Sequence, residues 1–129
     1  MKTLGLICFA LGLASLSFAA STQGTGISLD ELKSVVAKKA VTVLDVNGSE
    51  SFQEGRIPGA IDFIAQKKQI AALLPKDKNA LIVAYCANES CPAYKAAVSA
   101  AKELGYTNVK HYAGGIQGWK KSGAPVEKS

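Results

Sequence analysis

Short apolar runs alternate with amphipathic stretches along most of this chain. Residues 41–46 and 80–85 are apolar or β-branched runs of strand length, residues 80–85 have the strongest strand character, and residues 109–112 form a last predicted strand. Continuous apolar runs of this kind are typical of strands that helices cover on both faces. The stretches between the runs carry helical patterns, so the order of elements predicts an α/β domain with a mainly parallel sheet.

Helix signals stand at the ends of the stretches between the strands. Ser28 and Glu31 have the spacing of a capping box, Pro92 suits a first helical position, and Gly105 suits the residue after a helix. The predicted helices cover residues 29–38, 49–54, 65–74, 92–104 and a short stretch after residues 114–115. Residues 92–104 present a face of alanines for close packing, and we expect Trp119 to be a core residue over that face.

The amino-terminal segment has a different composition. After Lys2, residues 4–20 are almost entirely apolar, and Ser17-Phe18-Ala19 is a small-x-small cleavage pattern. We expect residues 1–19 to be a cleaved signal peptide, residues 20–26 a flexible lead and residues 27–127 one domain, with Pro125 ending the structured part. Export would place this domain in the periplasm with no stable membrane span after cleavage. A permanent anchor is the alternative, at the short limit of spanning length.

Composition and charge narrow the class of protein. A chain of 129 residues with 48% apolar residues is not collagen-like, disordered or a polytopic membrane protein. The formal net charge of +5 comes from lysines spread singly and in pairs near helix ends, so nucleic acid is not an expected partner. Of the three cysteines, Cys8 would leave with the signal peptide, which leaves Cys86 and Cys91 in the mature chain.

The segment from Cys86 to Cys91 is the candidate site. It lies between the most strand-like run and a helix start, and parallel sheets bind ligands at the carboxyl ends of their strands. We expect the loop amides of Ala87, Asn88, Glu89, Ser90 and Cys91 to converge on a substrate and to lower the pKa of the Cys86 thiol. The alternative is that Cys86 only packs as a small apolar residue. A disulfide between two cysteines this close in sequence would stabilise the fold little.

The chain resembles the single-domain rhodaneses, a family of sulfurtransferases, over residues 25–127. Residues 43–46 with Phe52, Gly55 and residues 56–60 are similar to that family's first signature, and residues 114–115 with Trp119 are similar to its last. Cys86 lies where the family has its nucleophile. The resemblance implies a three-layer fold, with a central, mainly parallel sheet of about five strands flanked by helices, and a cysteine that alternates between thiolate and persulfide.

The resemblance implies an enzyme that moves sulfane sulfur through a Cys86 persulfide. Relatives that use thiosulfate carry a basic residue in this loop, whereas this loop has Glu89 and neither Arg nor Lys. We therefore expect polysulfide or a persulfide to be a better donor than thiosulfate. The acceptor would be a thiol or cyanide, and an exported protein that accepts sulfur is a further candidate partner. Cys91 is a candidate resolving thiol that would attack the Cys86 persulfide and release hydrosulfide.

Two other functions stay open at this point. One is a dithiol/disulfide oxidoreductase that uses Cys86 and Cys91, and the other is a carrier that binds polysulfide without catalysis. Phosphatase chemistry is not expected, because Pro92 stands where phosphatases with a similar loop need an arginine. No cofactor or metal is expected, and His111 is expected to be a strand residue with its hydrogen bonds satisfied.

Overall fold

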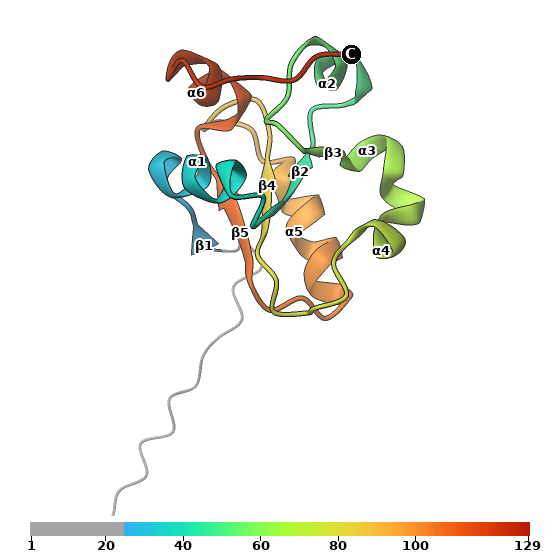
Figure 1. The fold of residues 1–129 in the computed structure, drawn as a ribbon. Helices are drawn as coiled ribbons and strands as arrows, with labels where there is room; N and C mark the ends of the chain where they lie inside the picture. Colours follow the sequence, from blue (N-terminus) through green and yellow to red (C-terminus); the bar gives the residue numbers. More distant parts are fainter. Residues whose placement is uncertain (1–24) are drawn as a thin grey trace, which may run out of the picture.

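The computed structural model describes residues 25–129, so the expected signal peptide and residues 20–24 of the expected lead lie outside the described part. Five parallel strands form one sheet in the order β1-β5-β4-β2-β3. The strands are β1 (Thr25–Gly26), β2 (Thr42–Asp45), β3 (Ile61–Asp62), β4 (Ile82–Tyr85) and β5 (Val109–Tyr112). Their carboxyl ends meet at the upper end of the domain in Figure 1, where α2 and α6 also lie.

Helices cover both faces of the sheet, which confirms the predicted three-layer α/β fold. The helices are α1 (Leu29–Ala37), α2 (Ser49–Glu54), α3 (Phe63–Gln66), the 3₁₀ turn η1 (Lys67–Gln69), α4 (Ile70–Leu73), α5 (Tyr94–Glu103) and α6 (Gly115–Lys121). One core cluster joins the sheet to α3, α4 and α5, and a second joins it to α1 and α6. Figure 1 shows these two groups on opposite sides of the sheet.

The local sequence signals explain several boundaries. The Ser28 hydroxyl accepts a hydrogen bond from the Glu31 amide at 3.2 Å, as an N-cap of α1 should. All four residues of β4 are fully buried, because this strand lies between two neighbours and under helices on both faces. Burial of apolar side chains is the dominant favourable term in folding, so this strand contributes to the stability of the domain.

Residues 65–74 do not form the single helix that we predicted. The Asp62 carboxylate accepts from the Ala65 amide at 3.1 Å, so α3 already begins at Phe63. The backbone then leaves helical geometry at Gln66 and again at Gln69, which divides the stretch into α3, η1 and α4. The helix predicted from Pro92 also starts later, at Tyr94, after a turn in which Pro92 and Ala93 accept from Lys95 and Ala96.

Both ends of the described chain are more ordered than the sequence predicted. Residues 25–26 of the expected flexible lead pair with β5 as the edge strand β1. Beyond Pro125, the main chain of Glu127 exchanges two hydrogen bonds with that of Arg56, at 3.0 and 2.9 Å. The Ser129 amide donates to the Gln53 carbonyl at 3.0 Å, so the tail is tied to the α2 region. The prediction that Pro125 ends the structured part is therefore wrong.

Trp119 is a core residue, but it lies on the other face of the sheet from the one predicted. Its side chain is 1% exposed and packs in the cluster with α1, while the alanines of α5 belong to the opposite cluster. Its indole nitrogen donates to the Pro125 carbonyl at 2.8 Å, which fixes the start of the tail.

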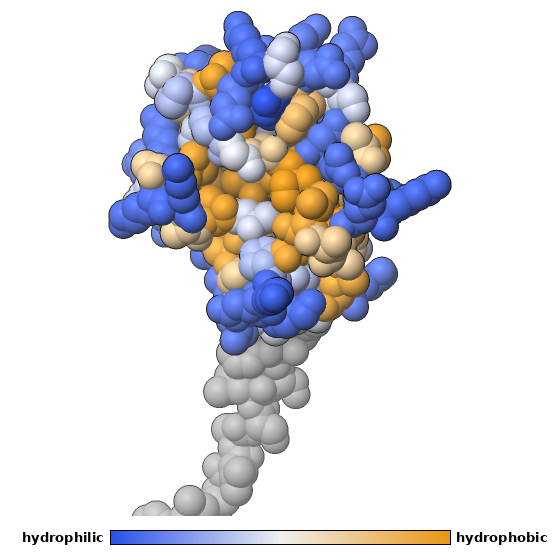
Figure 2. Space-filling view, turned by 45° about the vertical axis from the view of Figure 1, so that its right-hand side comes forward, coloured by the Kyte–Doolittle hydropathy of each residue, from blue (hydrophilic) through white to orange (hydrophobic). Residues whose placement is uncertain are grey.

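Apolar side chains also reach the surface. Figure 2 shows them gathered in the middle of one face, with polar side chains around them. The large apolar side chains that are exposed within the described part are Ile64 and Leu73, which belong to the short helices α3 and α4. No helix within residues 25–129 is both long enough and apolar enough to cross a membrane.

Candidate functional site

Cys86 follows β4 directly, at the end of the sheet where the carboxyl ends of the parallel strands meet. Its side chain is only 2% exposed. The chain then runs through a loop, residues 86–91, and two turn residues before α5 begins at Tyr94. The strand, loop and helix order predicted from the sequence is therefore present, with the thiol inside the protein and not at its surface.

Hydrogen bonds from two other segments, and bonds within the loop itself, hold the loop. The Cys86 carbonyl accepts from the Asn47 side-chain amide at 3.1 Å and from the Ile116 main-chain amide at 2.9 Å. The Ala87 carbonyl accepts from the Gln117 amide at 3.0 Å. Within the loop, Asn88 accepts from the Cys91 amide through its carbonyl and from the Ser90 amide through its side chain. The loop is thus fixed to the segment after β2 and to the first turn of α6.

The contact with α6 requires glycine at position 115. Gly115 has a φ of +63°, and a Cβ atom placed there would lie 2.5 Å from the Ala87 carbonyl carbon. The sequence showed the Gly114-Gly115 pair as a helix start and as part of the family's last signature, but not as a contact with the Cys86 loop. In the structure, the missing side chain lets two α6 amides reach the loop carbonyls.

The Cys86 sulfur lies at the amino-terminal end of α5. The Tyr94 amide donates to Sγ at 3.0 Å, and Ala93, the residue before the helix, supplies no side-chain cap. The sulfur thus takes the place of a capping oxygen and faces the positive end of the helix dipole. The Cys86 thiol in turn donates to the Cys91 carbonyl, with 3.5 Å between Sγ and O. Both cysteines are free thiols.

The pKa of Cys86 differs from the prediction. Burial and, after it, the contact with Cys91 raise the pKa of the Cys86 thiol to about 12, against the Tyr94 and Ala87 amides, which lower it. Burial opposes ionisation of Cys91 too, but hydrogen bonds from the Cys86 thiol and from the Ala93 and Ala87 amides lower the pKa of Cys91. Among the two thiols, negative charge is therefore favoured on Cys91 and the proton on Cys86.

A buried polar network supports the base of the loop. Asp45, at the end of β2 and 1% exposed, accepts from the Tyr85 hydroxyl and, at 2.8 Å, from the Asn47 amide. The Ile57 amide donates to the same Tyr85 hydroxyl at 3.1 Å. Asn47 therefore links the Asp45 carboxylate to the Cys86 carbonyl. Asp45 orders the backbone at the strand end and lies beneath the site, not in it.

The burial of Asp45 gives a testable dependence of stability on pH. Burial raises the pKa of Asp45 above its ordinary value of 3.8, although the Tyr85 and Asn47 hydrogen bonds oppose the rise. A carboxyl whose pKa is raised in the folded state stabilises the protein fully below its unfolded pKa, and this contribution is lost as pH rises through the folded pKa. Asp45→Asn removes that titration, so we expect the variant to gain stability relative to wild type as the pH rises above about 4, the ordinary pKa of an aspartate.

Urea unfolding at several pH values would measure this difference. Asp77→Asn is a matched control, because Asp77 also accepts an amide two residues on, from Asn79 at 2.9 Å, but in an exposed turn. A free-energy difference between Asp45→Asn and wild type that stays constant with pH would contradict the prediction.

A cavity of about 330 Å³ lies beside the loop. Its lining residues are Asn88, Glu89, Ser90, Gly114, Gln117, Gly118 and Lys121. Lys121 thus brings a cation to the outer side of a loop that has none of its own. The sequence had assigned this lysine to the solvated end of a helix, and no local signal would have shown where α6 packs.

His111 also differs from its prediction. Its ring stacks on the Tyr94 ring, with the centroids 4.4 Å apart, and its Nδ1 atom is buried without a hydrogen-bond partner in the described part of the chain. The expectation that its hydrogen bonds are satisfied is therefore wrong at that atom.

No group of three or more His, Cys, Asp or Glu side chains that could hold a metal occurs within residues 25–129.

A parallel α/β sheet with a cysteine loop at the carboxyl end of its central strand defines the class of protein. Residues 28–122 match the family model of the rhodanese-like domain, so the chain belongs to the rhodanese-like family. This confirms the family resemblance given by the sequence motifs around residues 43–60 and 114–119.

The chain is also similar to a curated protein and to solved structures. The chain is 38% identical over 89 residues to the HTH-type transcriptional regulator Rv0324 of Mycobacterium tuberculosis; the match covers 68% of this chain and 38% of that protein. A rhodanese-related protein from Thermoplasma volcanium is 26% identical, with a TM-score of 0.62 and coverage of 81% of this chain and 99% of that one. The human single-domain sulfurtransferase TSTD1 shares the fold at 24% identity, with a TM-score of 0.62 and coverage of 76% and 96%.

Proposed function

We propose that this protein is a sulfurtransferase that carries sulfane sulfur as a Cys86 persulfide. The single observation that carries the proposal is the position of the Cys86 sulfur, at the carboxyl end of β4 with the Tyr94 amide 3.0 Å from it. A helix-terminal amide stabilises a sulfur anion, and a persulfide is an anion of this kind at neutral pH. The family to which the chain belongs, which includes proteins described as sulfurtransferases, supports the same conclusion.

The reaction has two halves. In the first, a thiolate attacks the outer sulfur of a donor, a sulfur–sulfur bond forms to the protein, and the rest of the donor leaves as a thiolate or shorter polysulfide. In the second, a thiol or cyanide attacks the outer sulfur of the protein persulfide and restores the cysteine. The Tyr94 amide already donates to the Cys86 sulfur, so it needs no reorientation to stabilise the persulfide anion that forms there.

Charge around the loop favours a polysulfide or a persulfide as the donor over thiosulfate. Glu89 is exposed on the loop and lines the adjacent cavity, and the loop itself contains no cation. Lys121 offsets this charge only from the outer wall of the cavity. A dianion such as thiosulfate therefore meets a carboxylate where it needs a guanidinium or ammonium group.

We also propose where the protein acts and which acceptors it meets there. A cleaved signal at residues 1–19 would deliver the domain to the periplasm, where the acceptor would be a small thiol, cyanide or an exported protein that accepts sulfur. We expect neither nucleic acid nor a membrane to be a partner of this protein.

Intact mass spectrometry tests the function. After addition of a low-molecular-weight persulfide, wild-type protein should gain the mass of one sulfur atom, and peptide mapping should place that sulfur on Cys86. Cys86→Ser should lose turnover with cyanide or a thiol acceptor altogether. Wild-type protein that gains no sulfur from persulfide, polysulfide or thiosulfate would overturn the proposal.

A dithiol/disulfide oxidoreductase is the second candidate, because the Cys86 thiol contacts Cys91 directly. The same mass measurement separates the two functions. Sulfur transfer adds a sulfur atom, whereas oxidoreduction without transfer removes two hydrogen atoms as the Cys86–Cys91 disulfide forms.

A further inference from the structure

The two cysteines of the loop occupy unequal positions. Cys86 is 2% exposed, while Cys91 is partly exposed. The carbonyl and the thiol of Cys91 both contact the Cys86 thiol. A donor that approaches from solvent therefore meets Cys91 before it meets Cys86.

The amides around the pair also favour Cys91 as the first nucleophile. Burial opposes ionisation of Cys91, but the nearby Cys86 thiol and the Ala93 and Ala87 amides lower the pKa of Cys91. A lowered pKa favours the Cys91 thiolate as a nucleophile. Cys86 keeps its proton in this arrangement, since its thiol donates to the Cys91 carbonyl, with 3.5 Å between Sγ and O.

From this geometry we propose that Cys91 is the receiving thiol, which takes the sulfane sulfur from the donor and passes it inward to Cys86. The inference rests on the proposed sulfurtransferase function and adds the order in which the two cysteines act. It assigns Cys91 a catalytic step before the Cys86 persulfide forms, whereas a resolving thiol would act after it.

The relay balances without any oxidant or reductant. The Cys91 thiolate attacks the outer sulfur of a persulfide R–S–SH, forms Cys91–S–SH and releases R–S⁻. The Cys86 sulfur then attacks that outer sulfur, the bond from the outer sulfur to Cys91 breaks, and Cys86–S–SH forms. The electron pair of the broken bond stays on Cys91, and the Cys91 sulfur takes up the proton that the Cys86 thiol loses. The persulfide then has the Tyr94 amide as its donor.

Two substitutions at Cys91 test whether Cys91 accepts the sulfur and passes it on, or only shields Cys86 from solvent. If Cys91 only covers Cys86, Cys91→Ala removes a side chain over the buried sulfur and should speed the loading of Cys86. If Cys91 receives the sulfur, Cys91→Ala and the nearly isosteric Cys91→Ser should both slow the loading of Cys86 at least tenfold. The two roles therefore predict changes of opposite sign in one rate.

Loading would be followed by rapid quenching, alkylation and peptide mapping, with cysteine persulfide as the probe. In Cys86→Ser, sulfur should appear on Cys91 at a rate close to that of wild-type uptake, because the first step does not need Cys86. Urea unfolding of each variant shows whether it is folded.

Each outcome has a distinct meaning. Cys91→Ala that loads Cys86 as fast as wild type or faster overturns the relay and leaves the proposed function intact. Cys86→Ser that takes up no sulfur on Cys91 also overturns the relay. Wild-type protein that takes up no sulfur on either cysteine overturns the proposed function itself.

Discussion

Gly115→Ala is expected to lose at least about 3 kcal/mol of unfolding free energy and nearly all sulfur loading of Cys86. The new methyl group would lie 2.5 Å from the Ala87 carbonyl carbon and 2.6 Å from its oxygen, which are main-chain atoms that cannot turn aside. Either α6 or the Cys86 loop must move. Movement of either breaks the hydrogen bonds from Ile116 and Gln117 to the loop carbonyls. A domain with a total stability of about 5–15 kcal/mol would keep only part of it.

Gly123→Ala provides the matched control. Gly123 also has a positive φ, of +81°, but no atom lies within 4 Å of its would-be Cβ. Gly123→Ala should therefore lose only about 1 kcal/mol of unfolding free energy, which is the cost of an alanine in the left-handed backbone region. Urea unfolding and sulfur loading by mass spectrometry measure both variants. Equal losses of stability in the two variants would show that the contact between Gly115 and Ala87 is not what the glycine permits.

Most of the fold was accessible from local sequence patterns. The apolar run over residues 80–85 predicted the central strand. The structure buries four consecutive residues of this run among neighbours on every side. Ser28 predicted the start of α1 because its hydroxyl bonds within the same turn. Signals of this kind act over a few residues, so one sequence is enough to find them.

The features that the sequence did not predict depend on contacts between distant residues. Thr25 and Gly26 have no strand pattern and pair only because β5 offers an edge. The tail pairs with Arg56, which is far away in the sequence. The sequence also did not determine which face of the sheet Trp119 covers. The handedness of crossover connections fixes the side of a helix only where a further strand follows it, and no strand follows α6.

The site was predictable in position but not in electrostatics. The order of strand, cysteine and helix placed Cys86 correctly at the end of β4. The pKa of a thiol, however, depends on how deeply it is buried and on which groups it contacts. The contacts of Cys86 with Cys91 and Tyr94 exist only once the loop has folded over the sulfur. The same holds for Lys121, which reaches the cavity beside the loop through the packing of α6.

Glu89→Arg is expected to raise kcat/KM for thiosulfate at least about tenfold. Two opposite unit charges about 7 Å apart attract each other by roughly 1 kcal/mol at an effective dielectric constant between those of protein and water. The substitution removes a repulsion and adds an attraction for each of the two charges of thiosulfate. Salt screens part of this electrostatic energy. The part that remains stabilises bound thiosulfate by about 1.4 kcal/mol or more, which corresponds to the tenfold rise.

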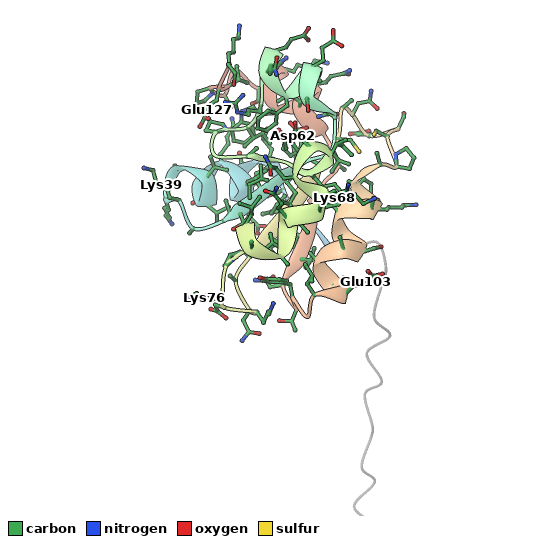
Figure 3. The ribbon with its side chains drawn as sticks, turned by 90° about the vertical axis from the view of Figure 1, so that its right-hand side faces the viewer. Lys39, Asp62, Lys68, Lys76, Glu103 and Glu127 are labelled. Atoms are coloured by element: carbon green, nitrogen blue, oxygen red, sulfur yellow. The ribbon has the colours of Figure 1, made fainter. Side chains whose placement is uncertain are left out.

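The control for Glu89→Arg is the same charge reversal at Glu103. Glu103 is the last residue of α5, and Tyr94, which contacts Cys86, is the first; Glu103 lies below Asp62 in Figure 3, so Glu103→Arg changes the net charge equally but far from the loop. Glu103→Arg should leave the thiosulfate rate unchanged, and Glu89→Arg should leave loading from cysteine persulfide almost unchanged because that donor carries less negative charge. A Glu89→Arg protein that loads from persulfide normally but gains nothing with thiosulfate would contradict the prediction. In that case the donor anion would have to lie away from Glu89, and the charge of the loop would not be what selects the donor.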